Sequence, residues 1–351
     1  MNKNMIVQDM DIEIEKTSHS KLSQVDVNNC PFGKIFSDHM LEMDYVDGKW
    51  TKANIKPFQD LVMSPASMVF HYGQAIFEGM KAYHLEGGGV GLFRPIDNIK
   101  RMNISAVRMS MPQIPEDIFL EGLKTLIDLD KNWIPTNIDS SLYIRPVLFA
   151  VDDFVGVKAS QNYKFIIFTS PANAYYTEPV KVKIETSYSR ACMGGTGFAK
   201  AAGNYAASLY PAQLAKKDGY DQLIWTDSKS HTQIEEAGTM NVMFVLNGKL
   251  ITPPSGETIL DSITRKSVVT LAEQMGIPVE ERIIYVDEIV EALKSNTLEE
   301  AFGAGTAATI APISLIGFKG VNYTLTDSKT WKVAPALLNE LNDIRTGKKA
   351  D

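Results

Sequence analysis

The sequence predicts a two-domain protein of mixed α+β or α/β architecture. Its 351 residues are enough for one large or two ordinary domains. Segments with strand-like and helix-like apolar spacing alternate along the chain. Between residues 171 and 180, two prolines flank a tyrosine pair, which is the strongest linker signal in the chain. We therefore expect a smaller α/β domain over 1–170, a linker over 171–180 and a larger α/β domain over 181–351, which would bind the cofactor inferred below.

The first predicted elements are a hairpin and a helix. Residues 80–83 and 90–93 have strand character, and Gly87–Gly89 between them favours a hairpin turn. Over 115–131 apolar residues recur at helical spacing, and the proline at the start suits the first turn of a helix. The first half therefore begins with β structure and continues into a helix.

Two apolar segments, 141–150 and 164–169, are typical of strands. Side chains alternate between the two faces of a strand, so Tyr143 and Arg145 should lie on the same face. Beyond the linker, turn and helix-end signals punctuate a further series of elements. They are strands at 180–186 and 222–225, helices at 205–217, 264–275 and 289–293, and a hairpin at 241–252 turning at Asn247 and Gly248.

Composition limits the class of partner. Hydrophobic residues make up 44% and charged residues 22%, as in ordinary soluble proteins. The net charge is −7 and no basic tract occurs, which argues against nucleic-acid and anionic-membrane partners. Residues 1–24 lack the apolar core of a signal peptide, and no apolar run reaches membrane-spanning length. We expect a cytoplasmic protein with small-molecule substrates.

The two cysteines, Cys30 and Cys192, are too far apart in the sequence for a zinc motif or a disulfide framework, and the histidines show no ligand-like pairing, so no metal is expected. For Cys192 we expect a small buried packing residue.

A glycine-rich segment, 194–200, ends in Lys200 and is followed by Gly203-Asn204-Tyr205. Lys200 is the only charged residue between Cys192 and Ser208. An amine in such surroundings is desolvated and can be kept neutral enough to act as a nucleophile. The competing interpretation is an ordinary solvated lysine.

Glu236, in the segment 235–241, offers this amine's cofactor a carboxylate. Taken alone, it could equally be a solvated loop residue or a helix-start carboxylate. Two other glycine motifs are excluded. Lys200 stands where a dinucleotide fingerprint needs its third glycine, and no Gly-Lys-Ser/Thr follows Gly87–Gly89.

Phosphate could bind at three places. Ile263 and Thr264 stand at a predicted helix start, where backbone amides are available to an anion. Thr306 lies in a second glycine-rich segment, and Arg101 could add a bidentate cation. Each of these taken singly is also explained by capping, turn formation or surface charge.

A reactive lysine, a carboxylate and a phosphate cradle together indicate pyridoxal 5′-phosphate. The carboxylate keeps the ring nitrogen protonated, so that the ring withdraws electrons from the substrate Cα. A charge pair at about 4 Å contributes roughly 4 kcal/mol at an effective dielectric near 20, enough to fix that protonation.

Several segments resemble the branched-chain amino acid aminotransferases of the fold-type IV pyridoxal-phosphate class. The matches occur in order and span about residues 30–345. The segments are His71-Tyr72-Gly73-Gln74-Ala75-Ile76-Phe77-Glu78-Gly79-Met80-Lys81, Leu92-Phe93-Arg94-Pro95, Ser141-Leu142-Tyr143-Ile144-Arg145-Pro146, Gly203-Asn204-Tyr205, Glu236-Ala237-Gly238-Thr239-Met240-Asn241 and Gly303-Ala304-Gly305-Thr306-Ala307.

This resemblance implies a role for each matching residue. Lys200 would form the Schiff base with the cofactor and later move a proton between the substrate Cα and the cofactor. Glu236 would pair with the pyridine nitrogen, and Tyr205 would bind the phenolic oxygen. The phosphate would be held by Arg101, Ile263, Thr264 and Thr306, and the substrate α-carboxylate by the backbone at Thr306 and Ala307.

The resemblance also implies that Tyr72, Phe77, Tyr143 and Arg145 select the substrate. The rings would pack the aliphatic side chain, and the arginine would meet the γ-carboxylate of glutamate. The alternative for each aromatic is plain core packing. Mammalian members carry a C-x-x-C pair where this chain has Ala308 and Ala311, so thiol regulation is not expected.

We thus expect a homodimeric transaminase that exchanges amino groups between leucine, isoleucine or valine and 2-oxoglutarate. A D-amino acid aminotransferase or an aminodeoxychorismate lyase on the same fold would keep Lys200 and Glu236. A scaffold without cofactor is a further alternative, although the lysine and carboxylate pair disfavours it. The sequence leaves open the preferred branched-chain substrate and the metabolic direction.

Overall fold

The computed structural model describes residues 12–137 and 140–351. The chain divides into two compact units, one within Met1–Tyr83 and Pro95–Asn173, the other comprising His84–Arg94 and Ala174–Asp351. Each unit combines a β-sheet with helices, so the predicted mixed architecture is confirmed. The N-terminal expectation for residues 1–24 falls in part on residues 1–11, which lie outside the described residues.

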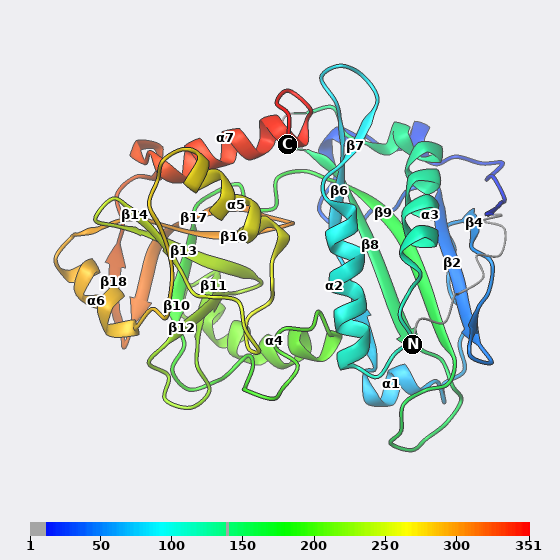
Figure 1. Cartoon of the computed structure of the whole chain (residues 1–351), viewed down its shortest axis with the longest axis horizontal. Coiled ribbons are helices and arrows are strands. Elements are labelled where there is room, and N and C mark those ends of the chain that lie inside the picture. The colour runs from blue at the N-terminus through cyan, green and yellow to red at the C-terminus, as the bar shows by residue number, and fades with distance from the viewer. Residues whose placement is uncertain (1–11, 138–139) are drawn as a thin grey trace, which may run out of the picture. The chain divides into compact units, whose positions relative to one another are not determined.

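The first unit is built on a mostly antiparallel sheet with helices packed against it (Figure 1). The strands run in the order β1 (Glu13–Ile14), β4 (Asn54–Pro57), β2 (His39–Val46), β9 (Tyr163–Ala172), β8 (Ser141–Ala150) and β6 (Met80–His84), with β3 (Lys49–Trp50) paired to β2 and β5 (Ala75–Phe77) paired to β8. The helices are α1 (Met68–Tyr72), α2 (Pro95–Arg108) and α3 (Glu116–Leu129), with 3-10 turns at Leu22–Gln24, Val27–Asn29 and Lys131–Trp133.

The longest ladder of this unit joins β8 to β9. It is antiparallel and extends from Ser141↔Ala172 to Ala150↔Tyr163. Strand β8 has the predicted bounds. Strand β9 extends past the predicted segment 164–169 because Ser141 and Leu142 continue the pairing as far as Ala172. This ladder fixes the place of Tyr143 and Arg145.

The second unit contains a sheet whose path returns on itself. Its strands run β12 (Ile234–Ala237), β11 (Gln222–Thr226), β10 (Val180–Ile184), β17 (Thr309–Phe318), β16 (Leu298–Gly305), β13 (Met240–Leu246), β14 (Lys249–Thr252) and β15 (Val279–Glu281), with β18 (Val321–Thr324) paired to β17. Because β12 also pairs with β13, the strands from β12 through β13 form a closed ring.

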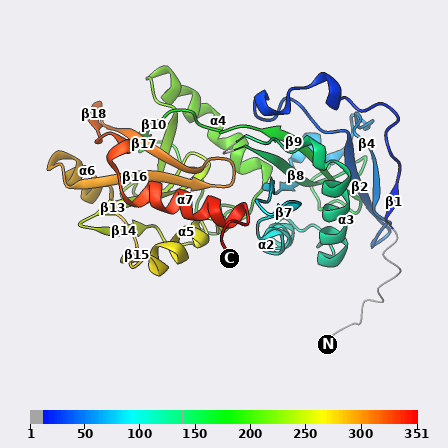
Figure 2. The ribbon, with the colours of Figure 1, turned by 90° about the horizontal axis from the view of Figure 1, so that it is seen from above.

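Helices cover this second sheet. They are α4 (Ala202–Lys217), α5 (Ile263–Gln274), α6 (Val286–Lys294) and α7 (Val333–Arg345), with a 3-10 turn at Ser328–Thr330. Helix α7 packs on α5, β16 and β17, as Figure 2 shows from above. Fully buried side chains such as Phe244, Phe302 and Leu337 fill the core between helices and sheet. None of the helices in the described part of the chain has the length and apolarity needed to cross a membrane.

The predicted local signals are confirmed at several points. Asn247 and Gly248 have φ values of 51° and 69°, as a two-residue hairpin turn between β13 and β14 requires. Gly276, with φ of 74°, follows α5. Strand, turn and strand occur around Gly87–Gly89, where β7 (Val90–Leu92) follows β6. Helix α4 begins at Ala202, three residues before its predicted start.

Candidate active site

The glycine-rich segment before Lys200 forms a compact turn. The Gly195 amide donates to the Cys192 carbonyl at 3.0 Å, and the Phe198 amide donates to the Glu257 carbonyl at 3.1 Å. Gly197 lies so close to its neighbours that a Cβ there would be 2.8 Å from the Thr258 Cα and 2.9 Å from the Glu257 oxygen. The glycine at 197 therefore lets the turn pack against the segment that begins at Glu257.

Asn204, in the first turn of α4, holds this turn in place. Its Nδ2 donates to the carbonyls of Thr196 and Ala199 at 2.7 and 2.8 Å. The Thr196 hydroxyl donates back to Asn204 Oδ1 at 2.7 Å. The sequence pointed to the Gly-Asn-Tyr motif but gave Asn204 no role; the structure assigns it to anchoring the backbone on both sides of the turn.

Lys200 follows this turn directly and is half-buried. Its Nζ donates to the Tyr205 hydroxyl at 3.1 Å. The two residues are five apart, and the start of α4 between them brings the side chains together. The structure thus joins two of the predicted site residues.

Glu236 lies in β12 and is only 4% exposed. Its Oε1 accepts the Leu260 amide at 2.7 Å, and the Leu260 carbonyl accepts from Asn241 Nδ2 at 3.2 Å. Asn241 is the residue paired with Glu236 across the β12–β13 hairpin. The chain from Glu257 to α5 is therefore held against the strand that carries Glu236.

Arg190 is a second partner of Glu236, and sequence reasoning missed it. Its Nε lies 3.0 Å from Glu236 Oε2. Its Nη2 donates to the carbonyls of Gly197, at 3.3 Å, and Thr258. In the sequence, Arg190 is visible only as an arginine shortly before the glycine-rich segment. No neighbouring residue indicated which carboxylate it would pair with.

Glu235, the neighbour of Glu236 in β12, is also buried, with 6% exposure. Its Oε2 has no hydrogen-bond partner among the described residues. Burial raises the pKa of Glu235 above its ordinary value, while a hydrogen bond from Thr258 and the charge of Arg190 act in the opposite direction. The positive charge of Arg190 therefore acts on two buried carboxyl groups, those of Glu235 and Glu236.

Helix α5 begins beside Glu236, as the contact through Leu260 requires. Ser262 caps it, with its hydroxyl accepting the Arg265 amide at 3.2 Å. Ile263 and Thr264 form the first turn and are buried. Amides in a first turn have no partner within their own helix, so they can bind an anion at the positive end of the helix dipole.

The segment with Thr306 and Ala307 lies at the end of β16, in the turn before β17. The sheet register brings this turn near the strand that carries Glu236. Glu236 pairs with Asn241 in β13, and Asn241 pairs in turn with Ala304 in β16. One unit therefore gathers Lys200, Tyr205 and Glu236 with the α5 start and the Thr306 turn.

The first unit holds a separate aromatic and cationic cluster. Arg145 Nη2 donates to the Tyr143 hydroxyl at 2.9 Å, which confirms the prediction that these residues share a face of β8. The guanidinium lies 4.6 Å from the Phe77 ring centre and 5.3 Å from that of Tyr143. Three of the predicted substrate residues are thus together.

A cavity of about 250 Å³ adjoins this cluster. Phe32 and Phe36, which the sequence did not single out, line it with Tyr143 and Arg145. The Phe32 ring meets the Tyr143 ring edge-on at 4.9 Å. These aromatics come from a segment more than 100 residues earlier, so local sequence patterns could not connect them to β8.

Tyr72 and Arg101 occupy other positions in this unit. Tyr72 ends α1, is 37% exposed and does not line the cavity. Arg101, in α2, forms a buried bidentate pair in which Nε and Nη2 each donate to Glu78 at 2.8 Å. Asn98 Nδ2 also donates to Glu78 at 2.8 Å. The residue proposed to bind phosphate is therefore also a member of a buried ion pair.

Residues 75–316, which include every residue named above for the lysine and carboxylate cluster, match the amino-transferase class IV family. The chain belongs to the class IV aminotransferases.

Named relatives cover nearly the whole chain. Branched-chain-amino-acid aminotransferase 2 of Bacillus subtilis (strain 168) is 45% identical over 97% of this chain and 94% of its own length. A probable branched-chain-amino-acid aminotransferase of Staphylococcus aureus (strain MRSA252) is 44% identical over 96% of this chain and 94% of its own.

The fold agrees with a solved enzyme. The crystal structure of the Escherichia coli branched-chain amino acid aminotransferase matches this class IV aminotransferase with a TM-score of 0.71 and 27% identity, covering 89% of this chain and 97% of the other. The predicted fold-type IV architecture is confirmed.

Pyridoxal 5′-phosphate is the cofactor of class IV aminotransferases. The residues of the second unit fit this group chemically. Lys200 supplies an amine, Glu236 a buried carboxylate and the first turn of α5 a set of amides for phosphate. These are the three kinds of partner that the cofactor needs.

Two other features of this class IV aminotransferase lie apart from the clusters. The expectation that Cys192 is buried was wrong: it is exposed, whereas Cys30 is buried. The reason is that Cys192 opens the turn of residues 193–198, whose first residues, Met193 and Gly194, also face solvent.

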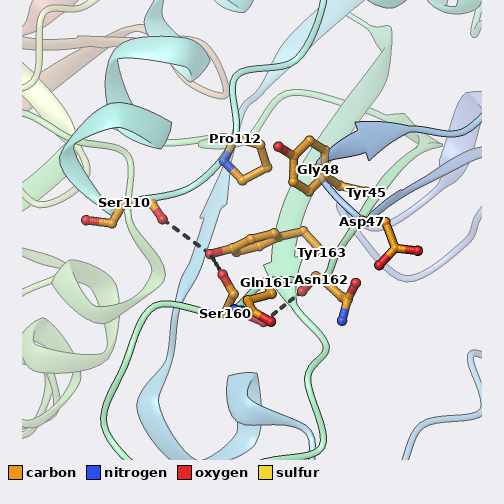
Figure 3. A pocket seen from close by; sticks show the side chains of 9 residues that line it. All are labelled: Tyr45, Asp47, Gly48, Ser110, Pro112, Ser160, Gln161, Asn162 and Tyr163. Atoms are coloured by element: carbon orange, nitrogen blue, oxygen red, sulfur yellow. Dashed lines mark hydrogen bonds between the residues drawn. The ribbon is translucent and has the colours of Figure 1, made fainter.

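A hollow of about 490 Å³ in the first unit contains none of the predicted site residues (Figure 3). Its polar wall includes Tyr163, whose hydroxyl donates to the carbonyls of Ser110 and Ser160. These internal hydrogen bonds occupy the Tyr163 hydroxyl.

Proposed function

We propose that this protein is a pyridoxal-phosphate-dependent branched-chain-amino-acid transaminase. It would interconvert L-leucine, L-isoleucine or L-valine and 2-oxoglutarate with the branched-chain 2-oxo acids and L-glutamate. The observation that carries this proposal is the hydrogen bond between Lys200 and Tyr205, together with the buried carboxylate of Glu236, which Arg190 links to the turn before Lys200. The names of the relatives, at 44–45% identity over almost the whole chain, support the choice of substrate.

Lys200 would attach the cofactor covalently and, once released by the substrate, carry a proton from the substrate Cα. The bound cofactor supplies an electron-withdrawing ring for this proton removal. Tyr205 supports the lysine's role, because its hydroxyl already accepts a hydrogen bond from Nζ and can hold an oxygen of the ligand. Glu236 would keep the ring nitrogen protonated.

The phosphate would bind to the amides of Ile263 and Thr264, the hydroxyl of Thr306 and the Arg101 side chain. The start of α5 supports the first two, because its amides and dipole favour an anion. Arg101 donates to Glu78 through Nε and Nη2 at 2.8 Å, which holds the guanidinium that would meet the phosphate in a fixed orientation. The backbone at Thr306 and Ala307 would receive the α-carboxylate, and residues 181–351 would form the cofactor-binding domain.

Substrate selection would depend on Tyr72, Phe77, Tyr143 and Arg145. Phe77 and Tyr143 offer apolar faces to an aliphatic side chain, and the guanidinium between them can pair with a γ-carboxylate. This combination supports a site that accepts both a branched-chain amino acid and glutamate.

Reduction of the holoenzyme with borohydride, followed by peptide mapping, tests the assignment of Lys200. We expect the label on Lys200 alone, and a visible absorbance band that disappears with L-leucine and returns with 2-oxoglutarate. Lys200→Ala should abolish turnover and labelling while keeping the fold, whereas Lys217→Ala, at the exposed end of α4, should behave as wild type. Labelling elsewhere would refute the assignment.

A substrate panel of L-leucine, D-alanine and aminodeoxychorismate distinguishes the proposed transaminase from the two other enzymes that share this fold. Turnover of L-leucine is expected. Turnover of D-alanine without L-leucine would replace the proposal with a D-amino acid aminotransferase.

We also propose a cytoplasmic homodimer. Both cysteines are free thiols, which suits a reducing compartment. Helix α4 exposes Leu209 and Tyr210, at 67% and 59%, and such apolar surface favours association. Light scattering on the purified protein should give twice the chain mass of 38.9 kDa; a monomer mass would exclude the dimer, and cell fractionation would test the location.

A further inference from the structure

Arg190 connects three segments of the second unit that are distant in sequence. One guanidinium reaches the Glu236 carboxylate, the Gly197 carbonyl in the turn before Lys200, and the Thr258 carbonyl in the segment leading to α5. Its side chain is 9% exposed. A planar guanidinium with several donors in a fixed arrangement can hold such a junction, which a lysine ammonium cannot do as well.

The contacts of Glu236 favour its ionised form. Oε2 lies next to the Arg190 cation and Oε1 accepts an amide hydrogen bond from Leu260. Among the described residues, the Glu235 carboxyl is affected by Arg190 and Glu236, and to a smaller extent by Asp227. The charge of Arg190 offsets these negative charges.

We propose that Arg190 is a positioning residue that keeps Glu236 ionised and fixes its distance from the turn carrying Lys200. This inference rests on the proposed pairing of Glu236 with the ring nitrogen of pyridoxal 5′-phosphate. Arg190 does not touch the cofactor in this proposal. It acts through the carboxylate and through the two carbonyls.

The physical consequence concerns a shared proton. When a carboxylate faces a pyridine nitrogen, a nearby cation lowers the proton affinity of the carboxylate and leaves the proton on the ring. Without Arg190, the proton would move toward Glu236 and the ring would lose charge. An uncharged ring withdraws fewer electrons from its link to Lys200, so that link would bind its own proton more tightly.

The test compares Arg190→Gln and Arg190→Lys with wild type and with Arg282→Gln. Arg282 is a chemically matched control, because it also pairs with carboxylates, Glu280 and Glu288, and donates to a carbonyl, that of Ile283. Three quantities are measured: the dissociation constant of pyridoxal 5′-phosphate from the apoenzyme, the midpoint of the pH titration of the visible absorbance, and the melting temperature of the apoenzyme.

For Arg190→Gln we expect at least about tenfold weaker cofactor binding, because Glu236 would be less ionised and less well placed to pair with the ring nitrogen. The absorbance midpoint should rise by about one pH unit. Arg190→Lys keeps the positive charge but loses the several donors that a guanidinium holds in fixed positions. Its absorbance midpoint should therefore stay close to that of wild type, whereas its cofactor affinity should fall. Arg282→Gln should match wild type in affinity and midpoint, whatever its melting temperature.

Wild-type affinity and midpoint in Arg190→Gln, with only a lower melting temperature, would show a purely structural role and overturn the proposal. If Arg190→Gln does not fold, Arg190→Lys decides: unchanged cofactor affinity would refute the proposal. Failure of the proposed function has a different signature, because the wild-type protein itself would then show no visible absorbance and no label on Lys200.

Discussion

Gly197 has less space around it than the other glycines of the lysine turn, Gly194 and Gly195. A methyl group at this position would be 2.6 Å from the Ala191 Cβ and within 3 Å of two backbone atoms of the next segment. We expect Gly197→Ala to lower the free energy of unfolding by about 1–3 kcal/mol, the usual cost of overpacking. Denaturant titration measures this.

Gly203 is the matched control, because a Cβ there meets nothing within 4 Å and the residue lies inside α4. Gly203→Ala should therefore stabilise the protein by about 0.5–1 kcal/mol. Equal stability of the two variants would contradict the packing argument.

Glu235 should make stability depend on pH. Burial raises the pKa of its carboxyl, so the native state binds this proton at pH values where the unfolded chain, with a pKa near 4.3, has released it. Stability then falls as pH rises from the unfolded pKa through the raised native pKa. Glu235→Gln has no such proton, so its melting temperature should rise relative to that of wild type as the pH increases above about 4.3, the pKa of the unfolded chain. Parallel melting profiles would exclude this role.

Residue chemistry was the part of the site that sequence could predict. The glycine-rich surroundings of Lys200 and its spacing to Tyr205 are local, and the structure brings these two side chains together. Arg190 was missed because its carboxylate partner, Glu236, and the Thr258 carbonyl lie tens of residues away, and only Gly197 is a near neighbour in the sequence. An ion pair of this kind has no periodic signature.

At the scale of elements, helix α7 depends on a distant carboxylate. Glu300, in β16, accepts the amides of Lys332, Val333 and Ala334 at 2.7–2.8 Å, which caps the start of α7. Glu300→Gln keeps one acceptor but loses the charge, so it should cost about 1–2 kcal/mol of stability.

The neighbouring Glu299 provides the control. It is exposed, and within the described part of the chain it accepts the Gly248 amide. Glu299→Gln should cost less than about 1 kcal/mol, and thermal melts of the two variants compare the effects. A larger loss in Glu299→Gln would contradict the capping interpretation.

This cap also explains which elements the sequence could predict. Hairpins with a favoured turn and helices closed by glycine carry their signals locally, and the 241–252 hairpin and α5 were predicted on those grounds. Helix α7 was not predicted, because its cap comes from a residue 32–34 positions earlier in the chain. Its stability comes from tertiary contacts.

At the scale of the molecule, mutations in one unit should affect substrate binding without affecting cofactor binding in the other unit. Arg145 belongs to the unit with Tyr143 and Phe77, whereas the lysine and carboxylate cluster belongs to the other. We expect Arg145→Met to raise the KM for 2-oxoglutarate at least about tenfold, because a charge-assisted contact is lost. The KM for L-leucine should change less, and cofactor affinity should not change.

Steady-state kinetics with each substrate and a cofactor titration check this expectation. Lys158→Met, which removes a cation near the Phe154 ring in the same unit, controls for charge alone. A parallel rise in both KM values would indicate that Arg145 shapes the pocket instead of binding the acid.

The mixed two-domain architecture followed from the alternation of patterns. The cavity walls did not follow, because Phe32 and Phe36 reach β8 only through the folded sheet. Long-range packing of this kind depends on the complete topology.

The double pairing of β12 has a consequence for hydrogen exchange. This short strand bonds to β11 on one side and β13 on the other, so it presents no open border to water or to another chain. Its amide hydrogens should be among the last to exchange with deuterium. The backbone beneath Glu236 would then remain in register even while the outer helices transiently open.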